Sequence, residues 1–142
     1  MPLALVLVVW SSVVSWVDLP DEFPSHWSGA RADAFLPTFS YVNVQSSSAA
    51  VAALVTTVMV IGNLWGWKWS PLARGISAVG AGVTAAISMG LYVQMFRSRG
   101  LSIEEAGELG VGAGALGVVG GFVIFALLSA AISPSGRHSP SQ

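Results

Sequence analysis

Long apolar runs alternate with short polar stretches along this chain of 142 residues. Four runs carry no charged side chain, at residues 1–17, 45–67, 75–96 and 109–136. A helix needs about 20 apolar residues to cross the hydrocarbon core of a bilayer, and a charge at the centre costs at least about 2.5 kcal/mol. The pattern therefore predicts an all-α integral membrane protein with four transmembrane helices and one long loop, residues 18–44, after the first helix.

The first run is the shortest, and a cleaved signal peptide is an alternative explanation for it. Signal peptides begin with a basic segment and end in small residues at the cleavage site. Residues 1–17 have no basic side chain, and the segment "SWVDLP" around their end is a poor cleavage site. We therefore expect the run to be retained as a helix. A start codon upstream of Met1 would account for the missing basic segment.

A capping box precedes the fourth run. Ser102 is followed three positions later by Glu105, so each side chain can bond the backbone amide of the other residue. The motif predicts a helix that begins near Ile103 and continues into the fourth run. Aromatic residues near the ends of the runs predict anchoring at the membrane interfaces. These residues are Trp16, Trp27, Tyr41, Trp65, Trp67 and Trp69.

Glycines recur at helical spacing in the third and fourth runs, which places them along one face of each helix. Small residues let membrane helices approach closely, where the hydrophobic effect contributes little. The stripe would serve either as a seam between two copies of the chain or as a contact within one chain. We favour the second, because four helices of one chain have to meet. The predicted packing glycines are Gly82, Gly90, Gly110, Gly114, Gly117 and Gly121.

Composition supports lipid as the main partner. The chain is 54% hydrophobic and only 9% charged, whereas a soluble domain is about one quarter charged. A net charge of −1 gives no electrostatic basis for binding nucleic acid. The absence of cysteine excludes disulfides, thiolate nucleophiles and Cys-ligated metals. No cofactor is expected.

The distribution of charge does not orient the chain by itself. Four spans would place both termini on one side of the membrane. The positive-inside rule counts Lys and Arg, and three lie on each side: Lys68, Arg74 and Arg137 on the side of the termini, and Arg31, Arg97 and Arg99 on the side of the long loop. All seven acidic residues lie on the side of the long loop.

The long loop contains a motif that begins "LPDEFPSHW" and continues through a glycine to an aspartate and an aromatic residue. Pro20 and Pro24 prevent the first helix from continuing, and Gly29 permits a tight turn. The stretch from the glycine to the aspartate, "GARAD", is one residue longer than the same stretch in the similar motif named in the next paragraph, and it lacks the proline of that motif. The motif residues are Leu19, Pro20, Asp21, Pro24, His26, Trp27, Gly29, Asp33 and Phe35.

This motif, placed between two apolar helices, resembles the N-terminal domain of the SdpI-like family of bacterial membrane proteins. The resemblance implies an SdpI-like domain over residues 1–62, with the motif loop extracytoplasmic and the termini cytoplasmic. The remaining transmembrane helices would occupy residues 63–133, and residues 134–142 would form a disordered cytoplasmic tail. The resemblance also implies immunity to, or sensing of, a secreted peptide or toxin, contacted by the motif residues.

The motif loop allows three other interpretations. A metal-dependent enzyme could draw ligands from His26, Asp21 and Asp33, with a fourth from another acid, but the loop offers one histidine and no cysteine. We favour a structural loop in which Asp21 caps a turn, His26 bonds the backbone and Trp27 lies among headgroups. A serine nucleophile beside His26 is disfavoured, because no carboxylate is placed to orient the imidazole.

A small transport-associated subunit is the alternative function. Intramembrane polar groups would indicate transport, and here they are uncharged and include Asn63 near the end of a span. Such a subunit would have another membrane protein as its partner. The glycine faces would also allow an oligomer.

Overall fold

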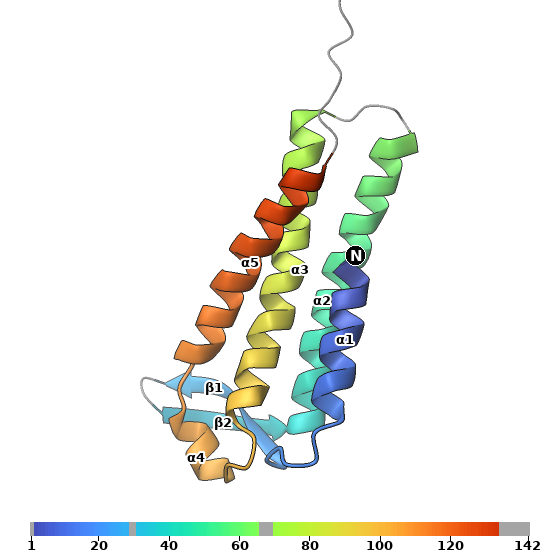
Figure 1. The fold of residues 1–142 in the computed structure, drawn as a ribbon. Coiled ribbons are helices and arrows are strands. Elements are labelled where there is room, and N and C mark those ends of the chain that lie inside the picture. The colour runs from blue at the N-terminus through green and yellow to red at the C-terminus, as the bar shows by residue number, and fades with distance from the viewer. Residues whose placement is uncertain (1, 29–30, 66–69, 134–142) are drawn as a thin grey trace, which may run out of the picture.

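The structure is a computed structural model that describes residues 2–28, 31–65 and 70–133. Long helices run side by side, and a two-stranded hairpin and a short helix cover one end of them (Figure 1). The tryptophans around Lys68 and the predicted tail lie outside the described residues. The elements in chain order are α1 (Pro2–Val14), β1 (Glu22–Ser28), β2 (Arg31–Pro37), α2 (Thr38–Trp65), α3 (Pro71–Arg97), α4 (Ile103–Glu108) and α5 (Gly112–Ile132).

Three of the described helices are long and apolar enough to cross a membrane: Thr38–Leu64, Pro71–Ser98 and Gly112–Ile132. This confirms the mostly helical, multi-pass membrane character predicted from the apolar runs. The remaining predicted span is the first apolar run, which forms α1. This helix has 13 residues and is therefore about 20 Å long, shorter than the roughly 30 Å hydrocarbon core. Figure 1 shows α1 beginning about halfway along the bundle and running to the hairpin end.

The segment between α1 and α2 differs from the predicted loop. Helix α2 begins at Thr38 instead of residue 45, and the strands Glu22–Ser28 and Arg31–Pro37 pair as an antiparallel hairpin. Charge and two prolines concealed the strands, which are too short to show clear alternation. The hairpin is irregular around His26, where the pairing register shifts between Pro24 and Trp27. The chain is thus not wholly α-helical.

Helix α3 is the central element of the bundle. It packs against α5 on one side and against α1 and α2 on the other, whereas α5 contacts none of the other long described helices. A core of six buried side chains joins α1, β1, α2 and α3 near the hairpin end: Val9, Val13, Phe23, Val42, Leu91 and Met95. Large apolar side chains cover the outer faces of α2 and α5, where lipid replaces water as the solvent.

Glycines allow the close contact between α3 and α5. A Cβ added at Gly117 or Gly121 would lie 2.6 Å or 2.7 Å from a backbone carbonyl oxygen of α3. Gly82, Gly90 and Gly114 face side chains of the opposite helix at similarly short range. The predicted glycine stripe therefore makes a contact within the chain, as we favoured.

Gly110 is the exception among the predicted packing glycines. It has a φ of +61°, and a Cβ added there would meet nothing within 4 Å. A positive φ suits glycine, and the residue forms the turn between α4 and α5. Helix α4 begins at Ile103 with the predicted capping box, but it ends at Glu108. The prediction of one continuous helix into the fourth run is therefore wrong.

Two contacts between helices have no signal in the sequence. Gly80 of α3 lies against Thr56 of α2, at a distance that would not admit a methyl group. At the end of the bundle away from the hairpin, the guanidinium of Arg74 donates to the carbonyl oxygen of Ala130, with its Nε at 2.7 Å. That carbonyl belongs to the last turn of α5, where helix carbonyls lack partners within the helix.

Candidate functional site

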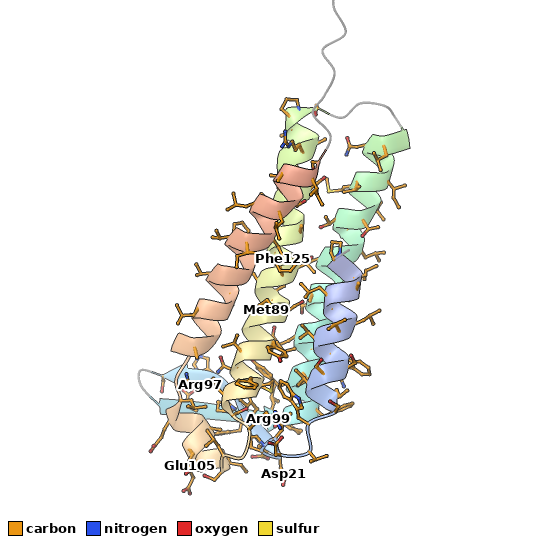
Figure 2. All side chains as sticks on the ribbon, in the orientation of Figure 1. Asp21, Met89, Arg97, Arg99, Glu105 and Phe125 are labelled. Atoms are coloured by element: carbon orange, nitrogen blue, oxygen red, sulfur yellow. The ribbon has the colours of Figure 1, made fainter. Side chains whose placement is uncertain are left out.

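The candidate site is the folded end of the bundle, which we call the cap. The cap comprises the described residues of segments 15–37 and 98–111, and thus contains the hairpin and α4. All seven acidic residues of the sequence lie in it. Figure 2 shows labelled Asp21 and Glu105 at this end, together with Arg97 and Arg99. Among the described residues outside the cap, only Arg74 and Arg97 are charged.

Strand β1 anchors the cap in the bundle through Phe23 and Pro24, both fully buried. The ring of Phe23 lies 4.9 Å from that of Tyr41 in α2, centroid to centroid. The same side chain belongs to the core cluster that α1, α2 and α3 share. An aromatic residue buried in this way contributes about 3–5 kcal/mol relative to alanine, so the motif's second proline and its neighbour hold the hairpin in place.

The start of α2 is bound to the motif backbone. The amide of Thr38 donates to the carbonyl oxygen of Asp21 at 2.9 Å, and its buried hydroxyl donates to the carbonyl oxygen of Pro20 at 2.5 Å. Two polar groups at the helix N-terminus are thereby satisfied. Asp21 was predicted to cap a turn. Its side chain is exposed and makes none of the described hydrogen bonds, and only its backbone carbonyl is engaged.

An ion pair joins the two connections that lead into the cap. The Nε of Arg99 lies 2.9 Å and 3.0 Å from the two carboxylate oxygens of Asp18, and the guanidinium lies 5.0 Å from the ring centroid of Trp16. The amide of Gly100 also donates to the carbonyl oxygen of Asp18 at 2.7 Å. The hydrogen bond from Arg99 lowers the pKa of the Asp18 carboxyl below its usual value.

His26 and Asp33 form a second pair, across the hairpin. Nδ1 of His26 lies 2.6 Å from Oδ1 of Asp33, and the two side chains are 69% and 43% exposed. The hydrogen bond to His26 lowers the pKa of the Asp33 carboxyl. We predicted a backbone partner for His26 and no carboxylate to orient it, and both predictions are wrong. The antiparallel pairing of β1 with β2 brings the two side chains together.

The pairing of an imidazole with a carboxylate would suit proton transfer, because the carboxylate orients the ring. A nucleophile is also needed for hydrolysis. Among the described hydrogen bonds, no hydroxyl contacts His26. The geometry therefore gives the hairpin a polar surface pair and no nucleophile–base arrangement.

Helix α4 is held by its capping box and by the hairpin. The amide of Ser102 donates to the Glu105 carboxylate at 2.8 Å, and the amide of Glu105 donates to the Ser102 hydroxyl at 3.3 Å. The hydrogen bond from the Ser102 backbone lowers the pKa of the Glu105 carboxyl. On the inner side, Gly107 is buried, and a methyl group added there would lie 3.6 Å from the ring of Phe35 in β2.

The possible metal ligands do not gather. Across the parts of the chain that the structure describes, no three His, Asp or Glu side chains are placed to hold one ion. His26 and Asp33 meet, whereas Asp21 precedes the other end of the hairpin, where Glu22 pairs with Pro37. The side chain of Trp27 and all of Gly29 lie outside the described residues.

Four carboxylates remain exposed after these pairs are formed. Asp18, Asp33 and Glu105 are engaged by their partners, and the others form no ion pair with any residue whose side chain is described. Two come from the start of the hairpin and two from α4. They are Asp21, Glu22, Glu104 and Glu108.

No family model, curated protein or solved structure matches this chain. The class of the protein therefore rests on its own features. It is a mostly helical, multi-pass membrane protein in which a two-stranded hairpin and a short helix form a charged cap over one end of the bundle.

Proposed function

We propose that the protein binds a secreted cationic peptide at an outward-facing cap, in an immunity or sensing role of the SdpI-like type. The observation that carries the proposal is the set of four exposed carboxylates on a firmly held surface. The resemblance of the proline-rich motif supports the role. Complementary charge steers a soluble partner to a surface and increases the rate of association.

The surface around these carboxylates suits an amphipathic partner. Phe35 of β2 is 39% exposed and Phe39 at the start of α2 is 61% exposed. Aromatic side chains commonly provide the contact energy at interfaces, while charges set specificity and rate. A peptide with basic and apolar faces would therefore find both kinds of contact on the cap.

The proposal requires a particular topology. The cap would be extracytoplasmic, the termini would be cytoplasmic, and α1 would be a fourth membrane helix that reaches from the cap into the bundle. Because the sequence has no cysteine, single cysteines can be introduced without a background. In intact cells, a membrane-impermeant thiol reagent should label Glu108→Cys in the cap and fail to label Ser70→Cys at the other end. The opposite pattern would contradict the proposal.

A binding experiment tests the function itself. The protein in nanodiscs of neutral lipid is titrated with a synthetic amphipathic peptide of lysine and leucine. We expect saturable binding that weakens as salt increases, because exposed charges are screened beyond about 10 Å at 0.1 M salt. A variant in which the four exposed carboxylates become amides should lose this binding. The control is Arg97→Gln, which removes an exposed cation next to the cap and should leave the binding intact or strengthen it.

The biological role needs a separate test. Deletion of the gene should sensitise the host to a secreted peptide, and the four-amide variant should not restore resistance. His26→Ala and Asp33→Ala probe the motif directly. If both of these variants and the four-amide variant protect cells as well as the natural protein, the cap is not the contact surface.

A transport-associated subunit is the second candidate. The observation that favours it is α5, which packs against α3 alone among the long helices described and leaves large apolar side chains outward. Another membrane protein could cover that face. Co-purification of a permease or an ATPase in mild detergent would support this function. Purification without any partner, from cells that the protein protects, would oppose it.

A further inference from the structure

A large apolar cavity lies in the half of the bundle away from the cap. Its volume is about 640 Å³. Its walls come from α2, α3 and α5, and its floor from Pro2 and Leu5 in the first turn of α1. Phe125 of α5 is one of the lining residues and is labelled in Figure 2. The cavity thus occupies the space that α1 does not reach.

The position of the cavity along the membrane-spanning helices determines what surrounds it. All three helices that form the walls are long and apolar enough to cross a membrane, and the lining segments 56–64 and 77–81 lie within them. Helices α2 and α5 do not contact each other, so hydrocarbon chains can approach between them. The medium next to the cavity is therefore lipid.

The polar atoms of the lining offer little to a polar ligand. Five hydroxyl side chains line the cavity, and four of them donate to a carbonyl of their own helix at 2.6–2.8 Å. A hydroxyl bound in this way presents mainly its carbon atoms. Water in an apolar cavity needs polar partners to stay. The four self-bonded residues are Thr56, Thr57, Ser77 and Ser133.

The shape of the lining also argues against another helix as the occupant. Membrane helices approach most closely through glycines, and none of the described residues that line the cavity is a glycine. The cavity walls instead carry Ile61, Leu64, Leu128 and Ile132. Branched side chains of this kind suit a flexible hydrocarbon chain, which adapts to an irregular surface.

We propose that this cavity holds one acyl chain of a membrane phospholipid, retained between α2, α3 and α5 above the first turn of α1. The volume is sufficient, because an apolar cavity of about 150 Å³ holds one benzene molecule, and this cavity is several times larger. The cavity opens on the flank of the bundle, and lining side chains such as Ile61 and Leu128, 41% and 54% exposed, gain dispersion contacts when a chain occupies it. The chain takes the place that a longer α1 would fill.

Photo-crosslinking tests the proposal. The natural protein is reconstituted with a phosphatidylcholine that carries a diazirine halfway along one acyl chain. It is then diluted into excess unlabelled lipid before illumination. We expect adducts at Val60 and Phe125, two half-buried residues of the cavity lining, and loss of adducts at Val58 and Leu127, which are 62% and 66% exposed on the same helices. Equal loss at all four positions would show ordinary exchange with bulk lipid and would overturn the proposal.

A matched pair of variants provides the control. Ala81→Phe on α3 fills the cavity from one wall, and we expect it to abolish the cavity adducts. Val79→Phe places the same ring on the same helix at a position that is 53% exposed, and should leave them unchanged. If Ala81→Phe does not fold, Ala81→Leu takes its place. Persistence of the adducts in a folded filling variant, or crosslinks from the cavity to a second protein copy, would refute an acyl chain as the occupant.

Discussion

Arg99 contacts both carboxylate oxygens of Asp18 through its Nε, although the two residues are 81 positions apart in the chain. The pair joins the connection after α1 to the connection after α3, and the guanidinium also lies over Trp16. Because both of these connections lead into the cap, the pair fixes where the hairpin sits relative to the helices.

Breaking this pair should loosen the cap and leave the helices intact. We expect Asp18→Asn and Arg99→Gln each to accelerate amide exchange at Gly100 and in residues 15–21, since the carbonyl of Asp18 is part of the same connection. Hydrogen exchange measured by mass spectrometry gives the comparison. The double variant should resemble either single one, because the two changes remove one interaction. Additive effects would contradict a direct pair, and Arg97→Gln is the control.

Acid should loosen the cap in the same way. The pKa values of Asp18, Asp33 and Glu105 are all lowered from 3.8 or 4.5, in each case mainly by a hydrogen bond to the charged form. A lowered pKa means that the folded state binds fewer protons than the unfolded state. The stabilisation that each carboxylate provides is therefore present at pH values above its unfolded-state pKa, and it is lost as the pH falls through its folded-state pKa.

We accordingly expect hairpin amide exchange, corrected for its intrinsic pH dependence, to be constant between pH 7 and about pH 5 and to accelerate at lower pH. The combined variant Asp18→Asn and Asp33→Asn should be faster at neutral pH and should respond less to acid. Protection of the hairpin amides that rises as the pH is lowered from about 5 to about 3 would contradict the lowered pKa values of these carboxyls.

The α3–α5 contact gives a prediction with an internal control. Gly121→Ala places a methyl group 2.7 Å from the carbonyl oxygen of Ala85, and Gly117→Ala places one 2.6 Å from that of Met89. Overpacking of this kind costs about 1–3 kcal/mol. A methyl group at Gly120 meets nothing within 4 Å, so Gly120→Ala should be neutral or slightly stabilising, given the higher helix propensity of alanine. Unfolding free energies in mixed micelles provide the measurement.

Arg74 provides a prediction at the opposite end of the bundle. Its guanidinium satisfies the carbonyl of Ala130 in the last turn of α5, and a positive charge there also complements the helix dipole. Arg74→Met should lower the free energy of unfolding by about 1.5–3 kcal/mol, the usual contribution of a hydrogen bond to a charged group. Arg97→Met, at an exposed position on the same helix, should have little effect. Equal losses in the two variants would argue against the α5 contact.

Local signals in the sequence predicted the helices well. The capping box of Ser102 and Glu105 is formed as expected, because both partners lie within one helical turn. The apolar runs correctly placed α2, α3 and α5, since burial in lipid depends on composition over a single helix. The start of α2 was missed by seven residues, because polar side chains near Thr38 concealed a helix that begins on the backbone of the motif.

Contacts between distant segments could not be predicted in this way. The hairpin depends on Phe23 entering a core built by three helices, and the pairing of His26 with Asp33 depends on the register of β1 against β2. Glycine spacing predicted that a close helix contact exists, but it did not reveal that Gly110 serves a turn or that Gly80 faces Thr56.

The sequence alone determined the solvent of this protein and the charged character of one end, because an uncharged run of sufficient length is stable in lipid whatever its neighbours are. Tertiary structure alone decided how the cap is attached, which acids pair with described partners, and where α1 leaves a cavity. Those features depend on distances between residues far apart in the chain, and such distances exist only after the helices have packed.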